Sequence, residues 1–288
     1  MVMSTNALRS ASRAAGRRLH NALTGFRSKK NIPTTTSSLS SQKKRYYSAS
    51  PNDDNSDHRE KDLEDKLAAK LRYDLAVAHR LTAQHSMDML VWNHISARFK
   101  DGCLITPGRM MWNDVKPEDL VFSSDNITAD IIHAAIYEAS PDIQAVMHLH
   151  TPAATAVSCL KEGFIPMTQD SAYFYDKVVH YEWDGVSDDV AEGPAITAAV
   201  KEATKKNANT ILFENHGFVC YGKSVPEVWI LCYYFERACE VQLRVMQSGG
   251  TPRMPNPKIM KQAAETSYLP EFYPGECEWE ALSKQVQF

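Results

Sequence analysis

The 288-residue sequence has no hydrophobic run long enough to cross a membrane. A spanning helix needs about 18 to 20 predominantly apolar residues, and the richest apolar stretch, VWILCYYF (228–235), is short and flanked by glutamates. Because 43% of the residues are hydrophobic, the chain can still bury a sizeable core. We therefore expect a globular protein without a membrane span.

Closely spaced cysteine pairs are also absent. The six cysteines are scattered, at positions 103, 159, 220, 232, 239 and 277, and no C-x-x-C pair occurs. Cys232 and Cys239 are seven residues apart in a helical pattern, which is the spacing of buried positions on one helix face. This usage predicts reduced thiols in packing roles, and neither a disulfide framework nor a structural zinc knuckle.

Acidic residues are missing from the first 52 positions. This segment holds ten of the 32 Lys and Arg residues and is rich in Ser and Thr, which is typical of an organelle transit peptide. Arginines recur every four residues on one side of a notional helix, and RYYSAS (45–50) resembles a mitochondrial processing site. We expect a transit peptide over 1–47, cleavage before Ser48, and a mitochondrial matrix location. A plastid or cytosolic location, or a disordered basic tail, remains the alternative.

The remaining chain is acidic, because 22 basic residues accompany all 35 acidic ones and the net charge is −13. Such a charge does not favour nucleic-acid binding. After a linker over 48–62, we expect one domain over 63–250 and a proline-rich surface tail with one short helix over 251–288. No internal repeat is present.

Hydrophobic periodicity predicts alternating helices and strands through the domain. A leucine-rich stripe from Leu63 to Leu81 marks a long amphipathic helix over 60–84. Further helical patterns cover 130–139, 153–163, 188–206 and 224–247, the last with Ser224 as its N-cap. Strand patterns cover 93–99, 103–106, 120–123, 143–150, 177–183, 209–214 and 217–222. This order predicts an α/β fold with a mixed central sheet and helices on both faces.

Two histidines interrupt the strand pattern in AVMHLHTPAA (145–154). Since successive strand side chains point to opposite faces, Val146, His148 and His150 share one face. A single histidine on an apolar strand is more often a hydrogen-bonded core residue than a metal ligand. The pair therefore needs a third partner before it indicates a metal site.

FENHGFVCYG (213–222) supplies that partner, because His216 follows a buried run at a turn where Gly217 permits a tight bend. Three imidazoles with one open coordination position are the pattern of catalytic zinc, whereas structural sites are usually closed by four ligands. Cobalt, manganese or iron can use the same ligands. We predict a divalent metal, with Zn²⁺ as first choice, held by His148, His150 and His216, and we expect His133 to pack behind it.

Three longer stretches carry a family resemblance: WNHISARF (92–99), HAAIYEASPDIQAVMHLHTPAATAVSC (133–159) and LFENHGFVCYGKSVPEVWILCYYFERACEVQLR (212–244). Together they resemble the class II aldolase/adducin family over roughly residues 65 to 250. The resemblance implies a three-layer αβα sandwich, a homotetramer with active sites between neighbouring subunits, and cleavage of sugar phosphates through a zinc-stabilised enediolate.

The chain departs from the aldolase members at their proton-transfer residue. Those enzymes have a Glu four residues before the histidine that matches His133, and this chain has Ala129 there. Alanine cannot transfer a proton, so another group must do so if the chain is an enzyme. Our candidates are Asp130, Tyr173 and Tyr175.

The phosphate-binding elements of the family are only partly matched. Asn93 and Ser96 stand in NHIS with one extra residue between them, and Arg109 lies beside a glycine loop. These three residues are the substrate-binding candidates. Arg109 can bind an anion through its guanidinium fork, although a solvated loop arginine is an equal alternative.

The sequence therefore supports two hypotheses. The first is an organellar, metal-dependent lyase or epimerase acting on a small hydroxy-carbonyl or sugar-phosphate substrate. The second is a catalytically inactive module like the adducin head, which lacks the Glu and serves oligomerisation or partner binding. Adducin binds actin and spectrin through a neck and a basic tail, and residues 268–288 do not resemble that tail.

Overall fold

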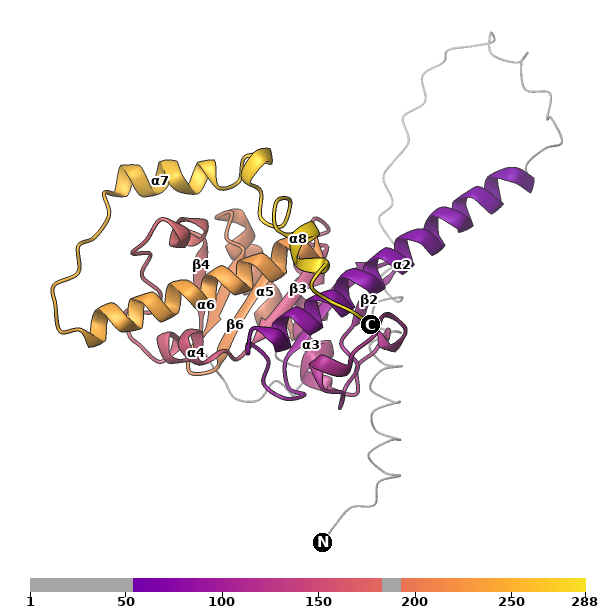
Figure 1. Cartoon of the computed structure of the whole chain (residues 1–288), viewed down its shortest axis with the longest axis horizontal. Helices are drawn as coiled ribbons and strands as arrows, with labels where there is room; N and C mark the ends of the chain where they lie inside the picture. The colour runs from indigo at the N-terminus through magenta and orange to yellow at the C-terminus, as the bar shows by residue number, and fades with distance from the viewer. Residues whose placement is uncertain (1–53, 183–192) are drawn as a thin grey trace, which may run out of the picture. The chain divides into compact units, whose positions relative to one another are not determined.

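The computed structural model describes residues 54–182 and 193–288, and the predicted transit peptide and its cleavage site lie outside these ranges. Six strands form one sheet in the order β2-β1-β3-β6-β5-β4 (Figure 1). The strands are β1 (His94–Phe99), β2 (Gly102–Ile105), β3 (Ala145–Leu149), β4 (Val178–Tyr181), β5 (Thr210–Phe213) and β6 (Gly217–Gly222). β4 and β5 pair in parallel and the other neighbours pair antiparallel, so the sheet is mixed, as predicted.

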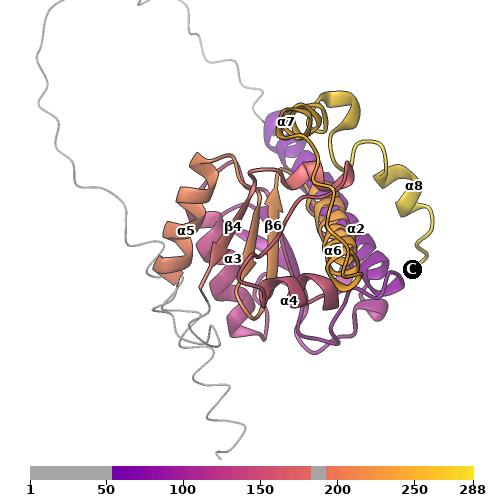
Figure 2. The same ribbon diagram turned by 90° about the vertical axis from the view of Figure 1, so that its left-hand side faces the viewer.

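Helices cover both faces of this sheet. The longer ones are α2 (Asp54–Gln84), α3 (Ile127–Ala139), α5 (Gly193–Lys205), α6 (Val225–Gln247) and α7 (Pro257–Thr266), and the shorter ones are α4 (Pro152–Ser158) and α8 (Trp279–Ser283). Figure 2 shows α3 and α5 on one side of the strands and α6 with α2 on the other. The predicted three-layer αβα sandwich is therefore confirmed.

Alternation along β3 divides the core into two clusters. Ala145, Met147 and Leu149 belong to the cluster that α2 and α6 cover. Val146 belongs to the second cluster, under α3 and α5. His148 shares the face of Val146, as predicted, and therefore points into the α3 side of the sheet.

Two predicted elements are shorter than expected. Of the strand predicted over 120–123, only an isolated bridge between Ile105 and Val121 forms. The pairing does not extend further in the direction of Pro107, because this residue has no N–H to donate. The helix predicted over 153–163 ends at Ser158, whose carbonyl accepts the amide of Asn215 instead of continuing the helix. The first correction follows from a proline beyond the partner strand, and the second accompanies a contact with a distant residue.

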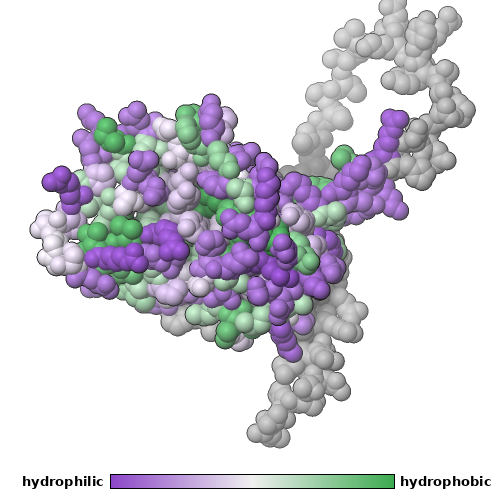
Figure 3. All heavy atoms as spheres, in the orientation of Figure 1, coloured by the Kyte–Doolittle hydropathy of each residue, from purple (hydrophilic) through white to green (hydrophobic). Residues whose placement is uncertain are grey.

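Helix α2 buries the predicted leucine stripe only in its second half. Leu75 and Leu81 are fully buried, whereas Leu63 and Leu67 are 69% and 51% exposed. In the space-filling view the visible surface of α2 is mostly hydrophilic (Figure 3). The helix begins at Asp54, within the segment predicted as a linker. Among the helices of the described ranges, none has the length and apolar character to cross a membrane.

The segment after Thr251 forms two helices where the sequence predicted one, and it packs onto the domain. Trp279 is 9% exposed, joins the larger core cluster and donates its indole N–H to Asp74 at 3.2 Å. Tyr273 donates its hydroxyl to the buried carboxylate of Glu227. The C-terminal segment thus supplies side chains to the same core as α2 and α6.

Candidate metal centre

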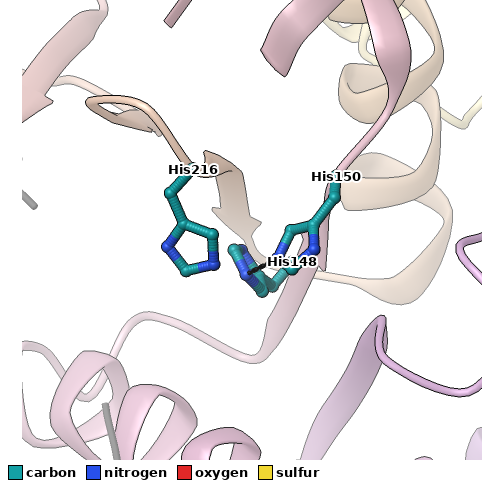
Figure 4. Close-up of side chains that lie close together, drawn as sticks. All are labelled: His148, His150 and His216. Carbon is teal, nitrogen blue, oxygen red and sulfur yellow. Dashed lines mark hydrogen bonds between the residues drawn. The ribbon is translucent and has the colours of Figure 1, made fainter. Parts of the chain in front are cut away.

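The structure brings the three predicted ligands together (Figure 4). His148 lies in β3, His150 follows the end of that strand, and His216 lies in the turn between β5 and β6. One nitrogen from each ring lies within 4.8 Å of the other two. Residues separated by more than sixty positions therefore meet at one end of the interior strands β3, β6 and β5.

Gly217 allows this close approach. A Cβ atom at Gly217 would lie 2.5 Å from the carbonyl oxygen of Leu149 and 2.8 Å from the ring of His150. Such distances are far inside van der Waals contact, so a larger residue would push β6 away from β3. The glycine that follows His216 thus sets the spacing of the three rings.

Hydrogen bonding orients the ring of His148. Its Nδ1 lies 2.9 Å from the carbonyl oxygen of Phe218, which can only accept, so Nδ1 carries the hydrogen. Nε2 then has a free lone pair, and it lies 2.7 Å from Nε2 of His150. A backbone carbonyl that fixes the tautomer is a common support for a metal-binding histidine.

The donor set fits a divalent transition ion. Burial lowers the pKa of His150 to about 4 and lowers the pKa of His148 well below its usual range. Both rings are therefore neutral at pH 7 and keep a lone pair for a ligand bond. A set of three imidazoles suits Zn²⁺ and related ions and leaves coordination positions open.

His94 is a site residue that the sequence did not reveal. It is 2% exposed and pairs with His148 across β1 and β3, with ring centroids 4.9 Å apart. Its Nδ1 lies 2.6 Å from Nε2 of His133. The NHIS motif was a possible signal, but a strand pattern does not show which strand will be its neighbour.

Ser96 lies behind the histidines and is completely buried. Its hydroxyl oxygen is 2.5 Å from Nδ1 of His133 and 2.8 Å from the hydroxyl oxygen of Tyr137. His133 is also completely buried, as expected for a residue that packs behind the site. The structure thus places the predicted substrate-binding Ser96 where it anchors His133.

The predicted substrate-binding residues Asn93 and Arg109 have different environments. Asn93 is 1% exposed, accepts the amide of Met89, and leaves its Nδ2 without a partner among the described residues. Arg109 lies on an exposed loop with a φ of 67°. A buried donor without a partner is costly, so Asn93 is the better candidate for contact with a bound group.

Asp130 lies near the start of α3, directly after the buried methyl group of Ala129. Its carboxylate accepts hydrogen bonds from the Ser123 hydroxyl and the Ser124 amide, both at 3.1 Å. Burial raises its pKa to about 6. The residue therefore holds the preceding loop and can exchange a proton near neutral pH.

The two candidate tyrosines lie at another part of the fold. Tyr173 lies in the short helix Asp170–Phe174 and packs against Tyr234 of α6 and Tyr268 in the C-terminal segment. Tyr175 follows the end of that short helix and is partly buried. Within the described ranges, no hydrogen bond or ring contact joins either tyrosine to His148 or His150.

Residues 73–243 match the family model described as "Class II Aldolase and Adducin N-terminal domain". A Pseudomonas aeruginosa protein with a provisional class 2 aldolase name is 31% identical over 193 residues, which cover 62% of this chain and 72% of that protein. Rat alpha-adducin is 30% identical over 207 residues, but the match covers only 27% of its length.

Among solved structures, an aldolase II superfamily protein from Pseudomonas syringae has the same fold. The TM-score is 0.67 at 25% sequence identity, and the match covers 75% of this chain and 92% of that one.

Proposed function

Because the chain belongs to the class II aldolase and adducin family, we propose that it is a metal-dependent enzyme of lyase or epimerase type. The proposed substrate is a small hydroxy-carbonyl compound or a sugar phosphate. The observation that carries the proposal is the convergence of His148, His150 and His216, with one nitrogen of each within 4.8 Å of the others. Three protein ligands leave room for a substrate at the same centre.

The three histidines would hold the ion, for which Zn²⁺ is the first choice. Bound there, the ion would act as a Lewis acid that polarises a carbonyl and its adjoining hydroxyl, which stabilises negative charge developing beside them. The chain's part is to orient the rings, through the Phe218 carbonyl on His148 and through the close approach at Gly217.

Proton transfer must come from a group other than residue 129. Asp130 is the first candidate, because a carboxyl with a pKa of about 6 can give and take a proton near neutral pH. Tyr173 and Tyr175 are second candidates. In the described part of the chain, none of the three candidates has a hydrogen bond or ring contact to His148 or His150.

The alternative is a catalytically inactive module like the adducin head. Two observations favour it: the alanine at position 129 and the 30% identity to rat alpha-adducin. Under this alternative the fold, and the histidines with it, would serve oligomerisation or partner binding.

Metal analysis of the purified full chain distinguishes the enzyme proposal from the inactive-module alternative. The enzyme proposal expects close to one divalent ion per chain by inductively coupled plasma mass spectrometry. A variant with both His148→Ala and His216→Ala should lose the ion, while the His85→Ala control, outside the centre, should keep it. A folded wild-type chain that binds no divalent ion would favour the inactive module.

Turnover is the second measurement. We expect metal-dependent cleavage or epimerisation of at least one compound in a panel of hydroxy-aldehydes and sugar phosphates. Asp130→Asn should lower kcat more than KM if Asp130 transfers the proton. The absence of turnover on every compound would count against the enzyme proposal.

We further propose that residues 1–47 direct the protein to the mitochondrial matrix and that the mature chain forms a homotetramer. The basic, acid-free composition of the segment supports the first part, and family membership supports the second. N-terminal sequencing of the protein from isolated mitochondria should begin at Ser48. Light scattering of the mature chain should give four times the monomer mass.

A further inference from the structure

A continuous polar chain lies between α3 and the sheet, directly behind the three histidines. Its members are Tyr137 and His133 on α3, and Ser96 and His94 on β1. All four are at most 9% exposed. The neighbours of Tyr137 and His133 on α3, such as Ile132 and Ile136, pack in the apolar cluster on this face, so the polar chain is an exception to its surroundings.

Three short hydrogen bonds join these residues in order. The distances are 2.8 Å from Tyr137 to Ser96, 2.5 Å from Ser96 to Nδ1 of His133, and 2.6 Å from Nε2 of His133 to Nδ1 of His94. Burial lowers the pKa of His133 to about 3, so its ring is neutral and carries one hydrogen. The bond between the two rings needs one nitrogen that donates and one that accepts, so the position of the hydrogen on His133 fixes the role of Nδ1 of His94.

The phenol of Tyr137, at one end of this polar chain, indicates in which direction the hydrogen bonds are donated. Among the described residues, the hydroxyl of Tyr137 has Ser96 as its one hydrogen-bond partner. If hydrogens ran from His94 toward Ser96, the Ser96 hydroxyl would have to donate either to the phenol, whose own hydrogen would then lack an acceptor, or to Cys103, its other hydrogen-bond partner. The first choice is costly in a buried site, and the second gives the hydroxyl only a sulfur atom, which is a weak acceptor. The guanidinium of Arg98 lies 4.6 Å from the Tyr137 ring centre and withdraws electron density, which favours the phenol as a donor.

When the hydrogen bonds are donated from Tyr137 toward His94, every donor within the polar chain has an acceptor. Tyr137 donates to Ser96, Ser96 donates to Nδ1 of His133, and Nε2–H of His133 donates to Nδ1 of His94. The one hydrogen of His94 is then on Nε2, the ring nitrogen turned away from His133. No hydrogen bond uses this nitrogen within the described ranges.

His94 lies beside the metal centre without being part of its ligand set. Its ring is 4.9 Å from that of His148, and it faces His148 across the strand pair. The set of nitrogens within 4.8 Å of one another contains His148, His150 and His216 but not His94. A nitrogen that carries hydrogen cannot bind a metal ion, but it can donate to a molecule held by one.

We propose that His94 is a fixed Nε2–H donor to an oxygen of the substrate, and that His133, Ser96 and Tyr137 are positioning residues that fix its tautomer. This inference rests on the proposed function. It also narrows the substrate to a molecule with an acceptor oxygen, carbonyl or carboxylate, next to the oxygen that the ion would hold. An α-hydroxy-carbonyl compound or an α-hydroxy acid has this arrangement.

The tautomer is tested by ¹⁵N NMR of the metal-free full chain labelled at histidine. We expect His94 to carry its hydrogen on Nε2, with its signal assigned by its loss in His94→Gln. His79 is an internal control of the opposite kind, because its Nδ1 lies 2.7 Å from the carbonyl oxygen of Leu75. Ser96→Ala should give a mixture of His94 tautomers, and Ser96→Thr, which keeps the hydroxyl, should restore one.

The donor role is tested by glycolate binding to the Co²⁺-loaded chain, followed by visible absorption. Removing a hydrogen bond to a charged oxygen should weaken glycolate binding by about 10- to 100-fold in His94→Phe. Co²⁺ affinity should not change, and His94→Gln, which has an N–H donor, should recover part of the glycolate affinity.

Three results would overturn the inference: hydrogen on Nδ1 of His94, loss of Co²⁺ affinity in His94→Phe, or unchanged glycolate affinity in that variant. A wild-type chain that binds no Co²⁺ would overturn the proposed function instead. In that case the NMR result alone decides whether His94 is an Nε2–H donor.

Discussion

His94 and His148 face each other on neighbouring antiparallel strands, with their ring centroids 4.9 Å apart. Each ring has one nitrogen held by a partner behind it, His133 for His94 and the Phe218 carbonyl for His148. The second nitrogen of each ring is thereby left for a separate role, which we propose to be donation for His94 and metal binding for His148. Substitutions that disturb the residues around these two rings should therefore alter the geometry of the candidate metal centre.

Metal binding should stabilise the folded chain. An ion that binds only the folded state at about 1,000 times its Kd adds about 4 kcal/mol to the free energy of unfolding. Addition of EDTA should therefore lower the thermal midpoint of the wild-type chain. The double variant His148→Ala with His216→Ala should show the same midpoint with and without EDTA. An EDTA effect that persists in this variant would place the ion elsewhere.

Gly217→Ala should weaken both folding and metal binding. The added methyl group would meet the Leu149 carbonyl oxygen at 2.5 Å, so β6 must move away from β3 and carry His216 with it. Overpacking of this kind costs about 1 to 3 kcal/mol. Urea unfolding and Co²⁺ titration measure the two effects. Gly102→Ala is the matched control, because nothing lies within 4 Å of its Cβ position, and it should change neither quantity.

Glu236→Gln should destabilise the turn that follows His150. The buried Glu236 carboxylate accepts hydrogen bonds from the Thr151 hydroxyl and from the first amides of α4, at Ala153 and Ala154. Loss of the negative charge at this helix N-terminus should cost about 2 kcal/mol of unfolding free energy.

Urea unfolding checks the Glu236 prediction. Glu240→Gln is the control on the same helix, where the carboxylate pairs with Arg237 and Arg244 at the surface. It should cost less than about 1 kcal/mol. Equal costs for the two variants would contradict the role assigned to Glu236.

Protonation of His79 should lower the free energy of unfolding at acid pH. Burial lowers its pKa from 6.5 to about 4, so the unfolded chain takes up the proton first as the pH falls. The stability contributed by neutral His79 is complete above pH 6.5 and is lost between about pH 6.5 and 4. At 1.4 kcal/mol per pKa unit, the loss is about 3 kcal/mol.

Urea unfolding at a series of pH values measures this contribution. His79→Gln should unfold with a smaller loss between pH 6.5 and 4 than the wild type, because glutamine does not titrate there. If the unfolding free energy of His79→Gln depended on pH in the same way as that of the wild type, the proton uptake would have to occur at another group.

Trp279→Ala should show that the C-terminal segment belongs to the folded domain. The indole is 9% exposed and is hydrogen-bonded to Asp74, so truncation should cost about 3 to 5 kcal/mol. Phe272→Ala is the control in the same segment, because Phe272 is 55% exposed and its loss should have little effect on urea unfolding. Similar small effects for both would indicate a segment that contributes nothing to the core.

The two shortened elements show why local pattern sets limits to prediction. The residues 120–123 have an apolar strand pattern, but their partner β2 is followed by Pro107, which has no N–H to extend the pairing. Helix α4 ends because Asn215 donates to Ser158. The first element is limited by the residue that follows its partner strand, and the second meets a hydrogen bond from a distant residue. The hydrophobic periodicity of the element itself contains neither piece of information.

The sequence by itself determined the α/β order, the face that His148 and His150 share, and the three histidines as a group. These follow from side-chain alternation in strands and from the chemistry of imidazole, both of which are local properties. Only the tertiary structure decided that β1 lies beside β3, which brings His94 opposite His148 and His133 behind it. Strand neighbours are chosen by the packing of the whole core, so the polar chain behind the metal centre appears only when the sheet has formed.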